Sequence, residues 1–155
     1  MTMRANGKAV KTFAANLLLD GRRCLLVGGG KIAARKLKAL LEAGAQVSLV
    51  APEIATSVEE LCLANGAELL RRKFQDADLS GAFIVVAASS DAALNKRIAE
   101  LCAEKRILCC AADENWPSGT FITPASFEAE GLKIAISTGW ASCRRSRILK
   151  ESLVS

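Results

Sequence analysis

The amino-acid sequence predicts an α/β fold, in which a doubly wound parallel sheet is followed by a small β-hairpin and a C-terminal helix. Short apolar runs alternate with segments of helical periodicity, which is the rhythm of βαβ units. The first of these runs turns through three glycines directly into a helical pattern. From Asn115 onward the alternation stops, and turn residues separate two short strand-like runs.

The expected parallel strands are apolar runs of a few residues, and the longest are apolar throughout, as is typical of strands buried on both faces. In chain order they are Cys24–Val27, Val47–Val50, Ala67–Leu70, Phe83–Ala88 and Ile107–Ala112.

Apolar residues at helical spacing predict a helix in three of the connections between these strands. The first helix follows Gly30 and ends at Gly44. The second ends at Asn65–Gly66, and the third is capped by Ser89–Asp91. The connection that contains Asp76–Leu79 predicts at most a short helical turn.

The two ends of the chain differ from this regular middle part. Residues 1–12 carry no hydrophobic period, and we expect them to form a mobile lead. After Asn115, strands at Thr120–Thr123 and Leu132–Ser137 are expected to form the hairpin, with the turn at Glu130–Gly131 before the second strand. A segment with a strongly basic start, from Trp140 to Val154, predicts the last helix.

The glycine turn fits a dinucleotide-binding fingerprint, Gly28-x-Gly30-x-x-Ala33, between a strand and a helix. In such a Rossmann-like unit, Gly28 permits the tight turn and Gly30 leaves room for a pyrophosphate. Ala33 lets the helix pack closely on the strand, and the helix N-terminus favours an anion. The alternative is an ordinary glycine turn of an α/β unit, but the strands and helix around the motif favour the dinucleotide site.

Composition excludes several reaction mechanisms. The 155 residues include no histidine and no tyrosine, so a Ser-His-Asp relay, a His-ligated metal and a Tyr-Lys proton relay are impossible. Any general acid or base must be a carboxylate, a lysine or a cysteine. The six cysteines form no C-x-x-C pair, and most lie in apolar patterns, so neither a zinc site nor a disulfide framework is expected.

Length and charge bound the possible partners. A hydrophobic content of 51% in 155 residues is enough for one domain with a proper core. No apolar run reaches the roughly 18 residues of a membrane span, and the N-terminus is polar, so we expect a cytoplasmic protein without membrane or nucleic-acid partners. The net charge of +5 suits an acidic partner, although scattered lysines and arginines are also what a solvated surface shows.

Asp113 is the candidate catalytic residue. It follows the last expected parallel strand, and ligands of doubly wound folds bind beyond the carboxyl ends of the strands. A carboxylate there can accept the proton that is released as a hydride leaves for a nicotinamide. The alternative is that Asp113 only turns the chain before Glu114–Asn115.

Taken together, these motifs resemble the precorrin-2 dehydrogenase family, the dehydrogenase part of siroheme synthase. The resemblance runs from about Asn16 to about Ser142. It is carried by Val27–Lys36, Ala88–Asp91 with Asn95, Asp113, Phe121–Pro124 and Leu132–Gly139. It implies that precorrin-2 gives up hydrogen to NAD and becomes sirohydrochlorin, that Asp113 matches an essential aspartate, and that the protein is a homodimer with Phe121–Pro124 and Leu132–Thr138 at or near the interface.

The resemblance also divides the chain into domains and shows departures. We expect a lead at 1–12, an NAD-binding Rossmann domain at 13–114, and at 115–155 the hairpin with the start of a dimerisation and substrate domain. The family usually has asparagine where this chain has Cys110, and its loop from Asp113 to Phe121 is one residue shorter. It also lacks the inserted Cys143–Ser146 segment and continues beyond the position of Ser155 into a helical domain.

The predicted site combines the fingerprint with the resemblance. The cofactor-binding residues are Gly28, Gly29, Gly30, Lys31, Ile32, Val50, Ala51, Pro52, Glu53, Ala88 and Ser89. NAD is expected rather than NADP, because Val47–Glu53 offers no arginine for a 2′-phosphate. The usual ribose-binding acid is missing from this strand end, so backbone groups at Val50 and Ala51 are expected to hold the adenosine side.

Substrate contacts are expected from the later part of the chain, at Ser137, Thr138, Gly139, Arg144 and Arg145, with Arg147 as a further candidate. Arginine suits the carboxylates of a tetrapyrrole because its planar fork donates two parallel hydrogen bonds, although a solvated helix face explains the same residues. Two other functions stay open. One is a bifunctional dehydrogenase and ferrochelatase, and the other is a non-catalytic NAD- or tetrapyrrole-binding module.

Overall fold

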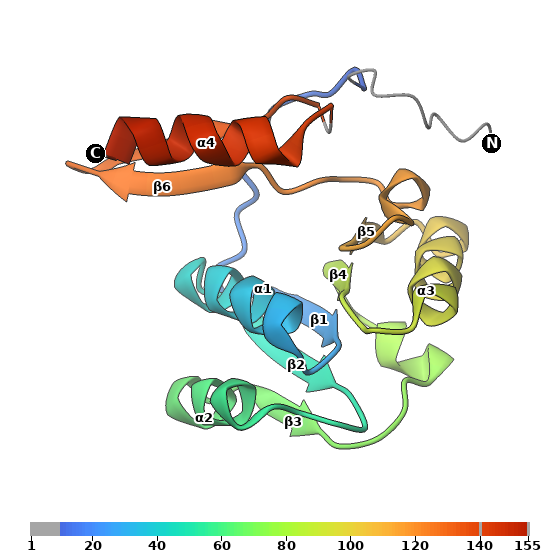
Figure 1. Cartoon of the computed structure of the whole chain (residues 1–155). Coiled ribbons are helices and arrows are strands. Elements are labelled where there is room, and N and C mark those ends of the chain that lie inside the picture. Colours follow the sequence, from blue (N-terminus) through green and yellow to red (C-terminus); the bar gives the residue numbers. More distant parts are fainter. Residues whose placement is uncertain (1–9, 140, 155) are drawn as a thin grey trace. The chain divides into compact units, whose positions relative to one another are not determined.

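The computed structural model describes residues 10–139 and 141–154 of the chain (Figure 1). Most of the lead expected at 1–12 and the expected start of the last helix, Trp140, lie outside the described residues. The described part separates into two compact units, one formed by Leu17–Phe121 and the other by residues 10–16 together with residues 122–139 and 141–154. Each unit is described by itself below.

The larger unit contains a sheet of five strands in the order β3-β2-β1-β4-β5, and every neighbouring pair is parallel. The strands are β1 (Arg23–Val27), β2 (Gln46–Val50), β3 (Glu68–Leu70), β4 (Ile84–Ala87) and β5 (Leu108–Ala111). The helices are α1 (Lys31–Glu42), α2 (Thr56–Asn65) and α3 (Ala92–Glu104), with a short 3₁₀ turn at Asp76–Leu79. No helix in the described ranges is long and apolar enough to cross a membrane.

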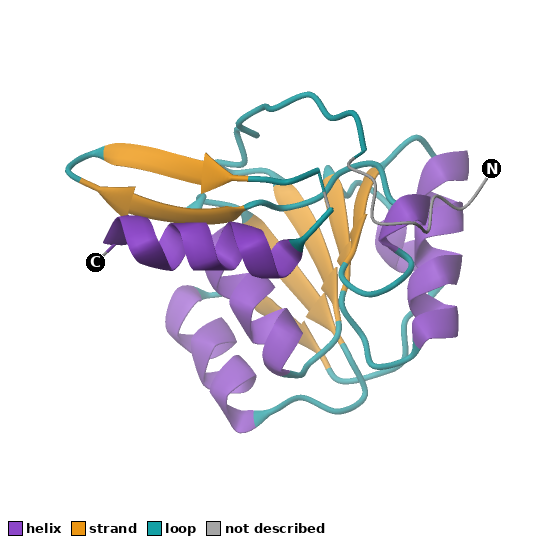
Figure 2. Ribbon diagram, turned by 45° about the horizontal axis from the view of Figure 1, so that its top comes forward, coloured by secondary structure: helices purple, strands orange, loops and turns teal. Residues whose placement is uncertain are grey.

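Helices cover both faces of this sheet, as Figure 2 shows. Side chains alternate between the two faces of a strand, so β1 sends Cys24 and Leu26 into one core and Leu25 and Val27 into the other. The first core is completed by α1 and α2, and the second by α3 together with Leu79 of the 3₁₀ turn. The doubly wound parallel sheet predicted from the sequence is therefore confirmed.

The strand order places a topological switch point beside β1. The chain runs outward from β1 to β2 and β3, then returns to place β4 on the other side of β1. At the carboxyl end, Val27 is paired with Val50 of β2 and with Ala87 of β4. Ligands of open α/β sheets bind in the crevice outside the strand ends at such a point, so this edge positions the candidate site.

The smaller unit is a hairpin with a helix packed on it. Strand β6 (Ala125–Ala129) is antiparallel to β7 (Leu132–Ile136), and α4 (Cys143–Val154) contacts both strands. The strand expected at Thr120–Thr123 is wrong, because the hairpin begins only at Ala125.

Residues at the start of that expected strand bond to β5 instead of to a hairpin partner. The backbone N–H groups of Thr120 and Phe121 donate to the carbonyl oxygen of Cys109 at 2.8 and 3.3 Å, and the Thr120 hydroxyl accepts from the Cys109 N–H at 2.8 Å. Pro124 then has no N–H to donate to a ladder. The first hairpin strand therefore starts after the proline.

Candidate functional site

The loop between β1 and α1 begins with a glycine that no other residue can replace without movement. Gly28 has a φ of +132°, and a Cβ built on it would lie 2.3 Å from the carbonyl oxygen of Ala88. Its own N–H donates to the carbonyl oxygen of Val50 at 3.0 Å. Gly28 therefore brings the carboxyl ends of β1, β2 and β4 to one place.

The next part of the loop is open toward a ligand. A Cβ built on Gly30 would meet no protein atom within 4 Å, and no side chain caps the start of α1 at this residue. The first N–H groups of α1 therefore remain directed at the space above Gly30, where the positive end of the helix dipole favours an anion. Ala33 is fully buried against the sheet. These residues fit the pyrophosphate of a dinucleotide.

Gly29 has a role that the fingerprint did not indicate. A Cβ on it would lie 2.3 Å from the carbonyl oxygen of Glu53, and its own carbonyl oxygen accepts a hydrogen bond from Ala55 N–H at 2.9 Å. This glycine lets the chain after β2 pack directly on the loop. Glu53 and Pro52 are exposed there, whereas Val50 and Ala51 are buried.

The carboxyl end of β3 brings two arginines into the neighbourhood of β2, which the sequence reasoning did not consider. Ala51 N–H donates to the carbonyl oxygen of Leu70 at 3.2 Å, and Arg71 and Arg72 follow directly. Arg71 pairs with Glu59 at 2.6 Å, and Arg72 pairs with Asp78 at 2.6 Å. The Arg72 guanidinium holds the pKa of Asp78, which is 8% exposed, below its usual range. Both arginines thus already have carboxylate partners.

Asp113 lies just beyond β5, at the same edge of the sheet. The residue before it, Ala112, donates its N–H to the carbonyl oxygen of Ala87 at the end of β4. Three hydrogen bonds from neutral donors hold the Asp113 carboxylate. They come from Asn95 Nδ2 at 2.8 Å, from Asn115 Nδ2 at 3.1 Å and from the Asn115 N–H at 2.9 Å. Asp113 therefore turns the chain after β5, and its carboxylate is also held in a fixed orientation.

The remaining predicted cofactor residues border the same loop. Lys31 and Ile32 lie exposed in the first turn of α1, directly after Gly30. Ala88 and Ser89 follow β4, and Ser89 N–H and hydroxyl both donate to the Asn95 side chain, at 3.1 and 2.8 Å. Sequence reasoning gave Asn95 no role. The available signal was its polar side chain on the buried face of a helix, where Asn95 is 1% exposed.

The predicted substrate residues lie in the smaller unit. Thr138 Oγ1 accepts from Ser142 N–H at 2.9 Å, and Ser142 Oγ accepts from Arg145 N–H at 3.1 Å, so this segment caps the start of α4. Ser137 Oγ accepts from Gly139 N–H at 3.1 Å, and Arg144 and Arg145 are exposed. The structure thus brings Ser137–Gly139 together with the start of α4, in a different unit from Asp113.

The five cysteine side chains that the structure describes are buried within the fold. Cys24, Cys62, Cys102, Cys109 and Cys110 are all free and buried. Burial raises the pKa of Cys24 to about 11 and also raises the pKa of Cys62. Such thiols stay protonated and behave as small hydrophobic groups. Within the described ranges, no three His, Cys, Asp or Glu side chains are placed to hold a metal ion.

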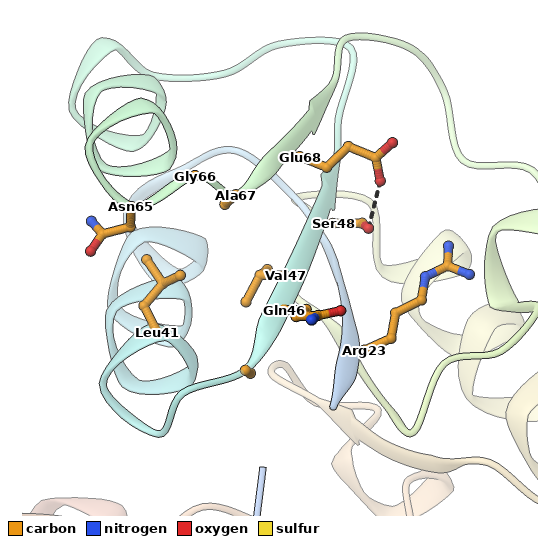
Figure 3. Close-up of a pocket in the computed structure, with 10 residues that line it drawn as sticks. Arg23, Leu41, Gln46, Val47, Ser48, Asn65, Gly66, Ala67 and Glu68 are labelled. Atoms are coloured by element: carbon orange, nitrogen blue, oxygen red, sulfur yellow. Dashed lines mark hydrogen bonds between the residues drawn. The ribbon is translucent and has the colours of Figure 1, made fainter. Parts of the chain in front are cut away.

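A hollow of about 500 Å³ lies at the opposite, amino edge of the sheet (Figure 3). The first residues of β1, β2 and β3 line it, together with the last turns of α1 and α2. Ser48 donates to Glu68 at 2.7 Å beside it. Because the strands are parallel, this hollow is a sheet length away from the glycine loop and belongs to another part of the surface.

Comparison with known proteins agrees with this geometry. Residues 15–125 match a family described as "Putative NAD(P)-binding". A siroheme synthase of Sodalis glossinidius is 39% identical over 88% of this chain, and one of Thioalkalivibrio sulfidiphilus is 36% identical over 92%. The chain spans 29% of the length of each of these two relatives.

A solved structure, that of SirC, precorrin-2 dehydrogenase, is similar with a TM-score of 0.80 and 33% identity, covering 92% of this chain and 69% of SirC. The family match extends over most of the chain, and the SirC match extends over both of its units. The chain therefore belongs to the NAD(P)-binding precorrin-2 dehydrogenase family, together with SirC and the corresponding domain of the siroheme synthases.

Proposed function

We propose that this chain catalyses the NAD-dependent dehydrogenation of precorrin-2 to sirohydrochlorin. The observation that carries the proposal is the oriented carboxylate of Asp113 beside the end of β4, the strand whose following loop packs on Gly28. The names of the relatives, siroheme synthase and precorrin-2 dehydrogenase, support the same reaction.

Each part of the site has a defined task in this reaction. When bound, the nicotinamide ring supplies the hydride acceptor. The N–H groups at the start of α1 bind the pyrophosphate over Gly30, and the backbone at Val50 and Ala51 borders the adenosine side. Asp113 accepts the proton that the substrate releases. The sequence contains no histidine that could accept this proton instead. The substrate thus loses one hydride and one proton.

The proposal specifies NAD rather than NADP. A 2′-phosphate needs an arginine near the end of β2, and the arginines next to that end are paired with Glu59 and Asp78. We expect tighter binding of NAD than of NADP in parallel calorimetric titrations. A preference for NADP would show that Arg71 or Arg72 leaves its carboxylate for the phosphate.

The proposal also includes substrate binding and assembly by the smaller unit. Arg144 and Arg145 are exposed and can each donate a bidentate pair of hydrogen bonds to a carboxylate of the macrocycle.

The two-stranded sheet β6–β7 is small for an independent unit, and Leu132 is 64% exposed on it. We infer a homodimer with Phe121–Pro124 and Leu132–Thr138 in or near the interface. Sedimentation showing only monomer at micromolar concentration contradicts this.

A single assay tests the activity and separates the alternatives. Precorrin-2 and NAD are incubated with the chain, with and without ferrous iron, and the reduced dinucleotide and the tetrapyrrole products are measured. We expect one reduced dinucleotide for each sirohydrochlorin formed. Siroheme formed only with iron and protein identifies an additional ferrochelatase activity. Binding of both ligands without any turnover identifies a binding module and overturns the proposal.

A further inference from the structure

We propose that Asn95 is a positioning residue that couples the dinucleotide loop after β4 to the Asp113 carboxylate. This inference rests on the proposed function, because it gives Asp113 the role of the base. It adds that one side-chain amide of α3 shares with Asn115 in setting the orientation of that base, and that the same amide fixes Ser89 at the edge of the cofactor site.

The Asn95 side chain uses its whole hydrogen-bonding capacity on two residues. Nδ2 donates to the carbonyl oxygen of Ser89 at 2.9 Å and to Asp113 Oδ2 at 2.8 Å. Oδ1 accepts from the Ser89 N–H at 3.1 Å and from the Ser89 hydroxyl at 2.8 Å. An amide has two donors and two acceptor sites, and all four are occupied here.

This pattern permits only one orientation of the amide. Rotation by half a turn would set the amide oxygen against the Ser89 carbonyl and the Asp113 carboxylate, and the NH₂ group against the Ser89 N–H. Asn95 is 1% exposed, so water cannot compensate for such a mismatch. The position of Asp113 Oδ2 is therefore fixed relative to Ser89.

The position of Ser89 is in turn fixed relative to the glycine loop. Ser89 directly follows Ala88, whose N–H donates to the carbonyl oxygen of Val27 at 2.8 Å and whose carbonyl oxygen occupies the place of a Cβ on Gly28. A ligand bound over the glycine loop thus lies beside backbone that Asn95 holds. Asn95 links this backbone to the carboxylate without any charged group of its own, which leaves the negative charge of Asp113 to act on the substrate.

A purely structural role for Asn95 predicts a different set of effects. A clamp on Ser89 alone needs only three of the four hydrogen bonds, and its loss would lower stability without changing the rate of the folded enzyme. A positioning role predicts that kcat falls in folded protein, since a displaced base no longer reaches the reacting proton. It also predicts that changes at Asn95 and at Asp113 are not additive in dinucleotide affinity.

The test compares Asn95→Asp, Asp113→Asn, the double variant Asn95→Asp/Asp113→Asn and the wild type. Asn95→Asp keeps the acceptor for the Ser89 N–H and hydroxyl but turns an oxygen toward both the Ser89 carbonyl oxygen and Asp113 Oδ2. We expect kcat to fall by about 100-fold with a much smaller change in KM for NAD. The double variant exchanges donor and acceptor across the 2.8 Å contact. It should regain part of the thermal stability and of the NAD affinity that Asn95→Asp loses, because the contact with residue 113 is restored while an oxygen still faces the Ser89 carbonyl. It should remain inactive because the carboxylate now lies on α3.

Asn65→Asp is the matched control. Asn65 is exposed in the last turn of α2 and donates to the Leu61 carbonyl oxygen at 2.9 Å, so the same amide-to-carboxylate change occurs far from the glycine loop. We expect its kcat and NAD affinity to stay within about twofold of the wild type.

The outcomes distinguish this inference from the proposed function. If the wild type forms no sirohydrochlorin, the proposed function fails, while the coupling is still read from NAD titrations and unfolding curves of the four proteins. If folded Asn95→Asp keeps its kcat, Asn95 does not position the base. If Asn95→Asp does not fold and the double variant recovers neither stability nor NAD affinity, the contact with Asp113 carries no coupling. Either of these last two results overturns the inference.

Discussion

The two edges of the parallel sheet differ in what they offer to a ligand. At the carboxyl edge, Gly30 leaves an open approach to the start of α1, and Asn95 and Asp113 are joined by a short hydrogen bond. At the amino edge, a hollow of about 500 Å³ is bordered by ordinary strand residues and by the last residues of α2, Asn65 and the Gly66 cap. This hollow is thus not the place where the chemical groups converge.

The direction of the helices explains this difference. Every helix that follows a parallel strand begins at the carboxyl edge, so the N–H groups and positive dipole ends of α1 and α3 gather there. The helices end at the amino edge, where carbonyl groups and negative dipole ends face solvent. A phosphate-bearing ligand is therefore favoured at one edge and disfavoured at the other. Backbone polarity therefore favours the carboxyl edge as the site.

The largest effect expected at the carboxyl edge is that of Asp113→Asn. The amide keeps the shape of the side chain but cannot accept a proton at neutral pH, so turnover should fall by about 10²–10⁴-fold. NAD affinity should persist, because Asp113 is not part of the glycine loop. Steady-state formation of sirohydrochlorin together with NAD titration checks both statements. An unchanged rate would make Asp113 a turn residue and leave the proton to water.

Gly30→Val is expected to abolish dinucleotide binding while the protein stays folded. A Cβ at this position meets no protein atom within 4 Å, so the valine side chain enters only the space intended for the pyrophosphate. The φ of −97° is also accessible to valine. Calorimetric titration should show at least a roughly 100-fold loss of NAD affinity with an unaltered melting curve. Unchanged affinity in the folded variant would remove the cofactor from this loop.

Gly29→Ala, in contrast to Gly30→Val, should lower the stability of the fold. The added methyl group would lie 2.3 Å from the Glu53 carbonyl oxygen and 2.8 Å from Ile54 Cα, so backbone must shift. We expect a loss of about 2 kcal/mol in the free energy of unfolding, measured with urea. Equal effects of Gly29→Ala and Gly30→Val on stability would contradict the division of the loop into a packed and an open glycine.

The fold was predictable because its strands are buried on both faces. Runs such as Phe83–Ala88 are typical of central strands, and the glycine turn after β1 fixes where the first helix begins. The hairpin was less predictable. The apolar pattern of Thr120–Thr123 suits a strand, but the first two of these residues are held by Cys109 of β5, a long-range partner that local sequence does not reveal.

The candidate site was predictable where a residue type has one structural use. Gly28 needs a positive φ, and Asp113 follows a buried strand, so both could be singled out from sequence. Asn95 could not be assigned a role, because its role depends on a contact with Asp113, which lies 18 residues further along the chain. Gly29 was assigned to the cofactor alone, since nothing in the fingerprint indicates its contact with Glu53.

The Asp78 carboxylate, which pairs with Arg72, is expected to stabilise the fold without taking part in NAD binding. Because Arg72 holds the pKa of this carboxyl below its usual range, the folded protein keeps it ionised at pH values where the unfolded chain binds a proton. The stabilisation is complete above the ordinary pKa of about 4 and is lost as the pH falls through the folded pKa. Urea unfolding between neutral and acidic pH should show this loss in the wild type. Asp78→Asn should show a smaller loss, with NAD affinity at neutral pH unchanged, and an equal loss would assign the acid sensitivity to other carboxylates.

The smallest effect is expected at the amino edge, from Ser48→Ala. Ser48 is 6% exposed and donates its hydroxyl proton to Glu68 Oε2 at 2.7 Å, whereas Glu68 is itself exposed. After the substitution, water solvates the carboxylate, so the free energy of unfolding should fall by only about 1 kcal/mol. NAD affinity should stay within about twofold of the wild type, since the Ser48 hydroxyl bonds to Glu68 and takes no part in the glycine loop. Glu68→Gln keeps an acceptor oxygen for Ser48 and is the matched control. Its free energy of unfolding should lie between those of the wild type and Ser48→Ala. A loss of NAD affinity in Ser48→Ala as large as that in Gly30→Val would show that the two edges act together and would end the distinction drawn between them.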